Sequence, residues 1–433
     1  MATATARRAS PGEAASRPLP SLAMIAGIDP LRHLGGHPSY VVAHGLAATA
    51  AGFAPHMFCA SDTAGSLQTE FGYLHRVAAP LAGMHRAAPV HQPFLAAAVT
   101  RHVTASQHPG PYLLHSFGAW ASSGVAAAHQ LGRRGTAAIP LASAYTLLRH
   151  ETYAKVAALR RHHGTGPRLS YLRDYAWVLA IADRAERRGY EQSRLVLTNY
   201  ESVRALLRDA CKPDLPVRLI PYASPAAFQA FDEPARMDLP EVLERLRPAD
   251  APLIVTVARH DARKGQDVLL LALSRLKQDG VQFRACLIGS GRLLAANRRL
   301  NRQLGLDDRV AIPGRIDDVF EYLRHADIFV LPSHEEGSGS VALLEALQAG
   351  TAIVSSRCDG IPEDLADAAD ALLVEPGDAG ELERALAALI ANPALRSRLA
   401  RRARELYETR FSSAALVDAL SEVYCQLAAE VIK

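Results

Sequence analysis

The segment PSHEEGSGSVALLEALQAG (332–350) carries the densest set of residues that could do chemistry. A loop with two acids and two glycines follows a predicted strand, and a helix begins near Ser340 or Val341. A glycine-rich turn before a helix offers free N–H groups and the positive end of the helix dipole, which suits a diphosphate. Glu336 could then hold sugar hydroxyls, and Glu345 could accept hydrogen bonds from a ribose. Alternatively, Glu336 is a solvated loop acid and Glu345 a surface helix residue.

A second segment, VARHDARKGQDVLLLAL (257–273), places two cations at the end of a predicted strand. Arg259 ends the strand, and Lys264 precedes a glycine and a helix. Parallel α/β folds bind ligands at the carboxyl ends of their strands. The two cations could therefore neutralise charge on a departing diphosphate. The alternative is that both are solvated loop residues.

The elements that would position these residues alternate between apolar runs and helical patterns, the pattern of parallel α/β units. A long stretch at 145–190 is predicted to form one or two helices, and the loop 31–39 leads into a helix over 40–52. The later predicted helices include 268–276 and 341–350. The predicted strands are 21–29, 55–60, 112–116, 137–143, 195–199 and 217–222 in the first half, then 253–258, 283–289, 310–314, 327–332, 351–356 and 371–376.

A proline-rich stretch without a strand pattern, 224–252, marks the boundary between two halves. The sequence therefore predicts an α/β protein with two Rossmann-like domains and parallel sheets facing a central cleft. The predicted parts are a disordered tail, an acceptor domain, a donor domain and a C-terminal helix packing back on the acceptor domain: 1–20, 21–235, 236–413 and 414–433.

The composition is that of an ordinary globular protein, because 49% of the 433 residues are hydrophobic and 21% are charged. The net charge of +4 is small for this length and weighs against a nucleic acid or membrane partner. Five widely spaced cysteines predict neither a disulfide framework nor a zinc site. Without a signal peptide or an apolar run of 18 residues, the expected location is the cytoplasm.

Several other classes of site lack their motif. Gly289-Ser290-Gly291 follows a strand without the third glycine of a dinucleotide fingerprint, and no P-loop occurs. No D-x-D triplet is present to hold a metal-bridged diphosphate. The histidines of RHHG (161–164) and RHVTASQH (101–108) show no metal-ligand spacing. We therefore expect no metal and no cofactor beyond a nucleotide-sugar co-substrate.

Six motifs in register make the second half resemble the retaining nucleotide-sugar glycosyltransferases of family 4, which have the GT-B fold. The resemblance runs from about 251 to 412. Its motifs are V-A-R-x-x-x-x-K-G, L-I-G-S-G (287–291), P-G-R-I (313–316), ADIFVLPS (326–333), the E-G…L-E-A-L-x-A-G block and SSRCDGIPED (355–364), followed by LLVEPGD (372–378) and RFSS (410–413).

The resemblance implies a role for each matching residue. Arg259 and Lys264 would stabilise the diphosphate leaving group, Glu345 would bind the ribose, and Glu336 would act catalytically on the donor sugar. Backbone groups of the helix turn would hold phosphate, two residues would lie near the base, and an early G-G turn would approach phosphate or sugar. These donor-binding residues are Gly337, Ser338, Gly339, Ser340 and Val341, then Arg315 and Ile316, then Gly35 and Gly36.

Three departures from the family pattern leave alternatives open. The paired acids have eight residues between them rather than seven, so Glu335 could replace Glu336. Tyr222-Ala223 stands where the family has Asn-Gly. Tyr145 stands near the family's active-site histidine, so the acceptor-side candidates are Tyr145, His37 and His115, the histidines being alternatively structural.

The resemblance thus predicts a metal-independent retaining glycosyltransferase. It would move a hexosyl group from a nucleotide-diphosphate sugar to the hydroxyl or thiol of a soluble small metabolite, such as a natural product. The alternatives are another GT-B enzyme (an inverting transferase, phosphorylase or epimerase) and a non-catalytic sugar-nucleotide-binding protein. The base, the donor sugar, the acceptor and the oligomeric state stay open.

Overall fold

The computed structural model describes residues 19–33, 35–106, 108, 111–158, 168–228, 240–336 and 339–431. The expected tail lies almost wholly outside the described residues. So do two of the expected donor-binding residues, Gly337 and Ser338, and the RHHG segment (161–164).

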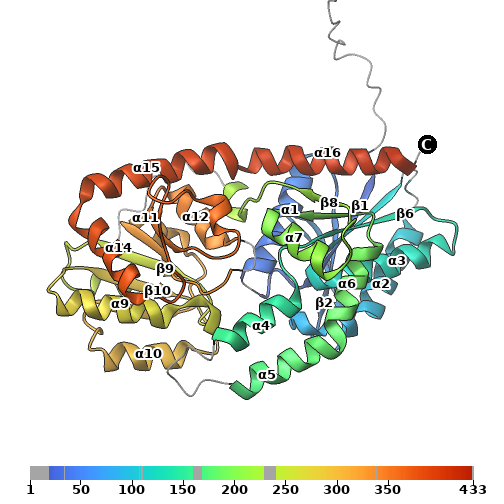
Figure 1. The fold of residues 1–433 in the computed structure, drawn as a ribbon. Helices are drawn as coiled ribbons and strands as arrows, with labels where there is room; N and C mark the ends of the chain where they lie inside the picture. Colours follow the sequence, from blue (N-terminus) through green and yellow to red (C-terminus); the bar gives the residue numbers. More distant parts are fainter. Residues whose placement is uncertain are drawn as a thin grey trace, which may run out of the picture.

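The first domain is built on an eight-stranded sheet with helices on both faces (Figure 1). The strand order is β3-β4-β2-β1-β5-β6-β7-β8, and only β3 runs antiparallel to its neighbour. The strands are β1 Ser21–Ile28, β2 His56–Ser61, β3 Gly65–Thr69, β4 Gly72–Ala78, β5 Tyr112–Phe117, β6 Ala138–Ser143, β7 Leu195–Thr198 and β8 Val217–Leu219. The helices are α1 Gly36–Ala50, α2 Ala88–Ala105, α3 Ala121–Gly132, α4 Leu148–Ala158, α5 Arg168–Trp177, α6 Asp183–Gln192 and α7 Glu201–Ala210.

The second domain is built on a six-stranded, all-parallel sheet with the order β11-β10-β9-β12-β13-β14. This is the doubly wound order of a Rossmann fold, whose direction of winding reverses between β9 and β12. The strands are β9 Leu253–Val257, β10 Arg284–Ile288, β11 Val310–Gly314, β12 Ile328–Leu331, β13 Ala352–Ser356 and β14 Leu372–Val374. The helices are α8 Glu241–Glu244, α9 Gln266–Gln278, α10 Leu294–Gln303, α11 Phe320–His325, α12 Val341–Ala349, α13 Ile361–Asp364 and α14 Ala379–Ala391.

The strands of a parallel sheet are covered by helices on both faces, so every side chain along them is buried and their sequences are continuous apolar runs. LIVTV in β9 and IFVL in β12 are almost wholly buried, and the helices beside them contribute apolar faces to the same core. The predicted fold class, two Rossmann-like α/β domains with parallel sheets, is confirmed.

Some elements differ from the sequence prediction. Helix α1 begins at Gly36, so the G-G turn caps a helix instead of lying in a loop that continues to 39. Strand β8 ends at Leu219, before the predicted end at 222. The stretch 145–190 contains α4, α5, a short π-helical segment at Val178–Ala182 and α6.

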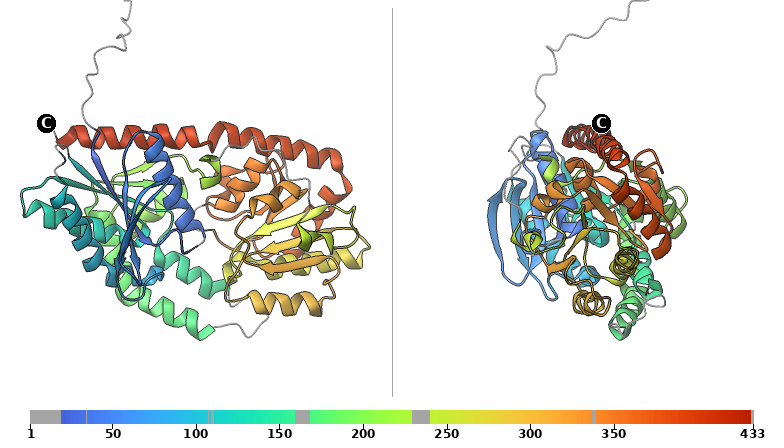
Figure 2. Two further views of the ribbon diagram at one scale, coloured as in Figure 1. Left: turned by 180° about the vertical axis from the view of Figure 1, so that it is seen from behind. Right: turned by 90° about the vertical axis from the view of Figure 1, so that its left-hand side faces the viewer.

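Two C-terminal helices, α15 Pro393–Arg410 and α16 Ser413–Val431, run along one side of both domains (Figures 1 and 2). α15 packs on α12 and β13 of the second domain, and α16 packs on α1 of the first. The Tyr424 side chain of α16 is buried in the first domain, 5.3 Å from the ring of Phe53. The chain therefore crosses back to its first domain at its end.

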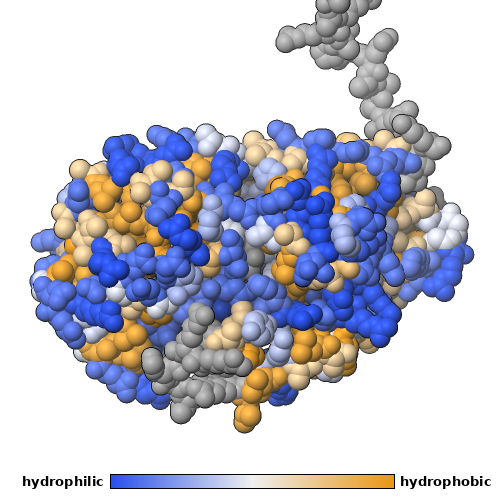
Figure 3. Space-filling view, in the orientation of Figure 1, coloured by the Kyte–Doolittle hydropathy of each residue, from blue (hydrophilic) through white to orange (hydrophobic). Residues whose placement is uncertain are grey.

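Polar side chains dominate the face seen in Figure 3, and apolar surface lies along its lower edge, where Figure 1 places α5. Leu169 and Leu172 of α5 and Tyr153 of α4 are exposed, Leu169 to 84%. Within the described residues, no helix has the length and apolar character needed to span a membrane.

Candidate active site

The predicted donor residues of the second domain lie at the carboxyl ends of its strands. Arg259 follows β9, Glu336 follows β12 and Asp359 follows β13. β9 and β12 are the neighbouring strands at which the winding reverses, the place where open α/β sheets bind ligands. The fold therefore gathers residues that are 100 positions apart in the sequence into one candidate site.

A buried ion pair joins Lys264 to Glu336. Lys264 Nζ donates to Glu336 Oε2 at 2.5 Å, and the two residues are 8% and 7% exposed. Ser333 Oγ donates to the other carboxylate oxygen of Glu336. Burial lowers the pKa of the Lys264 ammonium group and Arg263 lowers it further, although Glu336 favours its charge. The ion pair therefore keeps the positively charged ammonium group of Lys264 close to the end of β12.

Gly265 allows this pair to form. Its φ of +62° lies in the left-handed region, and a Cβ there would lie 1.9 Å from the carbonyl oxygen of Pro332. The loop after β9 can therefore approach the end of β12 only with glycine at this position.

The two acids of the loop have different surroundings. Glu336 is fixed by Lys264 and by its own backbone N–H, which donates to Asp359 Oδ2 at 2.6 Å. The Glu335 carboxylate lies 3.2 Å from His150 Nε2 of the first domain. Burial raises the pKa of Glu335 to about 8, with Arg263 acting in the opposite direction. Both acids lie at the site, so the choice between them stays open.

The N-terminus of α12 lies beside these acids. Ser340 is its N-cap residue, and no side chain caps the free N–H groups there in the part of the chain described. Gly339 lies against Tyr200 of the first domain, where a Cβ would be 1.8 Å from the tyrosine oxygen. Tyr200 in turn donates to Asp364 Oδ2 at 2.5 Å. Unsatisfied N–H groups at this end suit an anion.

Glu345 lies one turn further along α12. Burial raises the pKa of its carboxyl to about 7. Among the described residues it has no hydrogen-bond or ion-pair partner. A partly buried acid without a partner can accept hydrogen bonds from a ligand.

Arg315 and Ile316 follow the edge strand β11. Arg315 is exposed and its Nε donates to Asp317 Oδ1 at 2.9 Å, while Ile316 packs partly buried against the core. Neither residue contacts the Lys264–Glu336 pair in the described structure.

The first domain brings two of the three acceptor-side candidates together. His37, in the first turn of α1 after Gly35 and Gly36, bonds Tyr145 through Nδ1 and the Ala26 carbonyl through Nε2 at 2.7 Å. Because a carbonyl only accepts, Nε2 carries the proton and the tyrosine donates to Nδ1. Burial lowers the pKa of His37 to about 4, so it is neutral.

The third candidate, His115, is corrected by the structure. It lies within β5 and is 0% exposed. Its Nδ1 lies 2.8 Å from Tyr424 Oη and its Nε2 lies 2.8 Å from Ser143 Oγ. Both nitrogens are thus engaged inside the core, where an acceptor cannot reach, because α16 covers this part of the sheet.

The family match covers the second domain and not the first. Residues 243–406 match the family described as "Glycosyl transferases group 1". These residues form a group 1 glycosyl transferase domain.

The curated relatives match part of the chain. LpsE, a lipopolysaccharide core biosynthesis glycosyltransferase of Rhizobium meliloti, is 37% identical over 42% of this chain. A D-inositol 3-phosphate glycosyltransferase of Saccharomonospora viridis is 34% identical over 41% of this chain. The matched part spans about half the length of these relatives, 51% and 43% respectively.

The fold extends the likeness to the whole chain. The sucrose-phosphate synthase of Thermosynechococcus elongatus superposes with a TM-score of 0.71 at 23% identity, covering 95% of this chain and 100% of its own. The two domains around the site thus have the GT-B arrangement, as predicted.

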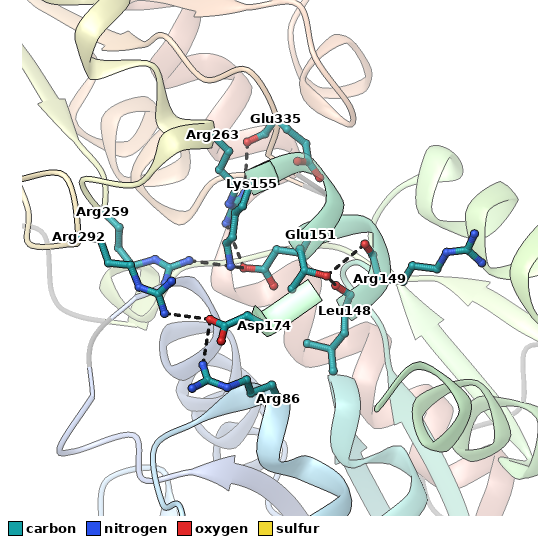
Figure 4. A network of polar contacts seen from close by, with 11 residues as sticks. Arg86, Leu148, Arg149, Glu151, Lys155, Asp174, Arg259, Arg263, Arg292 and Glu335 are labelled. Carbon is teal, nitrogen blue, oxygen red and sulfur yellow. Dashed lines mark hydrogen bonds and ion pairs between the residues drawn. The ribbon is translucent and has the colours of Figure 1, made fainter. Parts of the chain in front are cut away.

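A bridge of charged residues that the sequence prediction missed joins the group 1 domain to the first domain (Figure 4). Glu151 points from α4 toward Arg259 and Arg263, with its Oε1 at 3.5 and 3.7 Å from their Nη2 atoms. The same oxygen accepts from Lys155 Nζ at 2.7 Å. Burial alone would raise the pKa of Glu151, but these three cations hold it well below its usual range.

Asp174 of α5 forms a second bridge. Its Oδ2 accepts from Arg86 of the first domain at 3.1 Å and from Arg292 of the group 1 domain at 3.0 Å. Tyr222 stands where the family pattern has Asn-Gly. Its ring centroid lies 5.4 Å from that of Tyr40, and both side chains are buried. The missed residues come from the first domain or from loops, where the sequence offers a charge or a ring but no motif.

Proposed function

We propose that this chain transfers a sugar from a nucleoside-diphosphate sugar to an acceptor hydroxyl or thiol, with retention of anomeric configuration. The observation that carries the proposal is the Lys264–Glu336 pair, buried beside the free N-terminus of α12 at the reversal point of the sheet. The group 1 domain match over 243–406 supports the same class of activity.

The donor would lie along the carboxyl edge of the second sheet. Arg259, Lys264 and the N–H groups at Ser340 and Val341 would hold the diphosphate. Glu345 would accept hydrogen bonds from the ribose, and Arg315 with Ile316 would lie near the base. Glu336 or Glu335 would hold hydroxyls of the sugar, while the turn at Gly35 and Gly36 would approach the donor from the first domain.

The chemistry would be leaving-group stabilisation. The bond between the anomeric carbon and the diphosphate oxygen breaks, and its electron pair stays on the diphosphate. Lys264 and Arg259 would neutralise that charge, and fixed charges accelerate the step because they strengthen as charge develops. The acceptor oxygen or sulfur then bonds to the anomeric carbon on the same face, and its proton passes to the departing diphosphate oxygen. These side chains supply positive charge themselves, so the proposed reaction needs no metal.

His37 and Tyr145 would lie on the acceptor side. The neutral imidazole holds the Tyr145 hydroxyl in place through Nδ1, and its own Nε2 is fixed by Ala26. The two residues would therefore shape and orient the acceptor site, with Tyr145 offering its oxygen as an acceptor of hydrogen bonds.

The proposed acceptor is a soluble small metabolite, and the S. viridis relative is named for D-inositol 3-phosphate. A second class is an acceptor on an apolar anchor. The observation that favours it is the exposed apolar surface of α4 and α5, with Tyr153, Leu169 and Leu172, and the R. meliloti relative is named for lipopolysaccharide core biosynthesis.

The test uses purified chain and a panel of UDP-, GDP- and dTDP-sugars. A bound donor raises the unfolding temperature, and slow donor hydrolysis reports turnover without a known acceptor. We expect one base to stabilise the chain, and NMR of the released sugar or product to show the donor's anomeric configuration. Inverted product would indicate another GT-B enzyme. Tight binding without hydrolysis or transfer across soluble and lipid-linked acceptors would leave a non-catalytic binding protein.

A further inference from the structure

Three imidazoles from separate elements meet in the first domain, away from the candidate active site. His56 is the first residue of β2, His75 lies within β4 and His102 lies in the last turn of α2. One ring nitrogen from each lies within 4.8 Å of the other two. The active-site residues follow the carboxyl ends of the strands, whereas His56 begins its strand, so the cluster belongs to the opposite edge of the sheet.

Neighbouring side chains fix the orientation of the His75 ring within the cluster. His56 Nδ1 lies 2.9 Å from His75 Nε2, and Ser66 Oγ lies 2.8 Å from the other nitrogen of His75. A hydroxyl that accepts from Nδ1–H leaves Nε2 with its lone pair directed into the cluster, as in metal sites where a second group fixes the tautomer. The ring of Phe58 stacks on His75 at 4.7 Å and limits its rotation.

We propose that His56, His75 and His102 bind one divalent cation of the zinc class, with water completing the coordination. Imidazole nitrogens suit Zn²⁺, Cu²⁺ and Ni²⁺, whereas Mg²⁺ and Ca²⁺ take oxygen ligands. Tetrahedral Zn–N bonds of about 2.0–2.1 Å place ligand nitrogens about 3.3 Å apart. The observed separations, from 2.9 Å up to 4.8 Å, reach this geometry with shifts of about 1 Å.

A hollow of about 600 Å³ gives access to the cluster. His75 and His102 line it together with Phe58 and residues of β4 and α2, including Pro93 and Phe94. The fourth coordination position can therefore face solvent. Because the three ligands come from β2, β4 and α2, a bound cation would stabilise the first domain instead of taking part in sugar transfer.

The experiment uses the full chain without an affinity tag, treated with EDTA and then titrated with ZnCl₂. We expect one Zn²⁺ per chain by metal analysis and a rise in Tm of about 5–10 °C at a hundredfold excess over Kd. Co²⁺ in place of Zn²⁺ should give the intense visible absorption of a tetrahedral nitrogen site.

His75→Gln and His102→Gln should each weaken Zn²⁺ binding at least tenfold. The matched control is His129→Gln, on the exposed side of α3 and outside the cluster. His102 lies in the last turn of α2, where a substitution disturbs the fold less than within β4. His102→Gln therefore tests the proposal even if the His75→Gln protein unfolds. Equal Zn²⁺ responses in all three variants, or a Co²⁺ spectrum like that of the free ion, would overturn the proposal. None of these readouts depends on donor turnover, so the outcome is separate from the proposed function.

Discussion

At the scale of single residues, the candidate site depends on charges held out of water. Lys264 and Glu336 are both buried and satisfy each other, so removing either leaves an uncompensated charge. Glu345 has no such partner in the described structure, and burial raises its pKa to about 7. A site that keeps an unpaired acid of this kind gives up stability that a ligand can restore.

Lys264→Ala should lower kcat for donor turnover by about tenfold to a hundredfold, because one charge-assisted contact contributes roughly 1.5–3 kcal/mol. The control is Lys277→Ala, which breaks an exposed lysine–aspartate pair of 2.6 Å in the same domain. Thermal unfolding is measured beside kcat, since Glu336 loses its cation. Near-normal turnover in a folded Lys264→Ala protein would contradict the assigned role.

Glu345→Gln should stabilise the free chain at pH 8 and leave it unchanged near pH 4. The folded pKa of about 7 lies above the ordinary 4.5, so folding takes up a proton between these values. The ionised acid therefore opposes folding above about pH 7, and this cost fades as the pH falls toward 4.5.

The same substitution should weaken donor binding at pH 8, where the carboxylate is the better acceptor for ribose hydroxyls. Tm of the free chain and Kd for the preferred nucleotide, both measured across pH, check the two effects. A Glu345→Gln protein that is less stable than wild type at pH 8 would show that Glu345 is favourably paired.

At the scale of elements, α4 and α5 bring acids of the first domain onto the cations of the second. Glu151 of α4 faces Arg259 and Arg263, and Asp174 of α5 faces Arg292. In the proposed function Arg259 holds the diphosphate, so the donor and Glu151 would compete for this cation.

Glu151→Gln should tighten binding of the nucleoside diphosphate about threefold to tenfold, because it removes the competing charge while keeping the shape of the side chain. Isothermal titration at low ionic strength gives the Kd. Glu405→Gln, which loses an exposed pair with Arg402 on α15, is the matched control. Weaker binding in the Glu151 variant would mean that the acid positions the arginines for the donor.

Prediction from sequence succeeded where a signal is local. The buried strands of the second domain read as uninterrupted apolar runs, and the places of Arg259, Lys264 and Glu336 after those strands follow from the runs, whereas the roles of these residues stay predictions. The hairpin of β3 and β4 was missed because its exposed residues, such as those of GSLQT, lack an apolar period. Glu151 and His102 carry no local signal for these contacts, because Arg259 lies 108 positions from Glu151 and the other two histidines lie 27 or more positions from His102.

At the scale of the whole molecule, α16 makes the first domain depend on the end of the chain. Tyr424 reaches His115 in the central part of the sheet, and Glu430 and Glu422 pair with Arg194 and Arg218 at its surface. The histidine predicted to meet an acceptor thus joins strands to a helix 309 positions away.

Tyr424→Phe should lower the unfolding free energy by about 1–2 kcal/mol, because a buried nitrogen of His115 loses its partner. This corresponds to a fall in Tm of roughly 2–8 °C for domains of this size. Tyr73→Phe, at an exposed ring, should leave Tm unchanged. Equal Tm values for both variants would show that the Tyr424 hydroxyl contributes nothing to stability.

The double crossing of the chain determines how the two domains can separate. One crossing lies between β8 and β9 and the other between α15 and α16, where Arg410 donates to the carbonyls of Asp364 and Glu363. α15 and α16 run along one side of the molecule, and α4 and α5 lie on the opposite side in Figures 1 and 2. A rotation of one domain against the other about the side of α15 and α16 would move α4 and α5 the most, because they lie farthest from that axis. Such a rotation would therefore lengthen the ion pairs of Glu151 and Asp174 more than the contacts near α15 and α16.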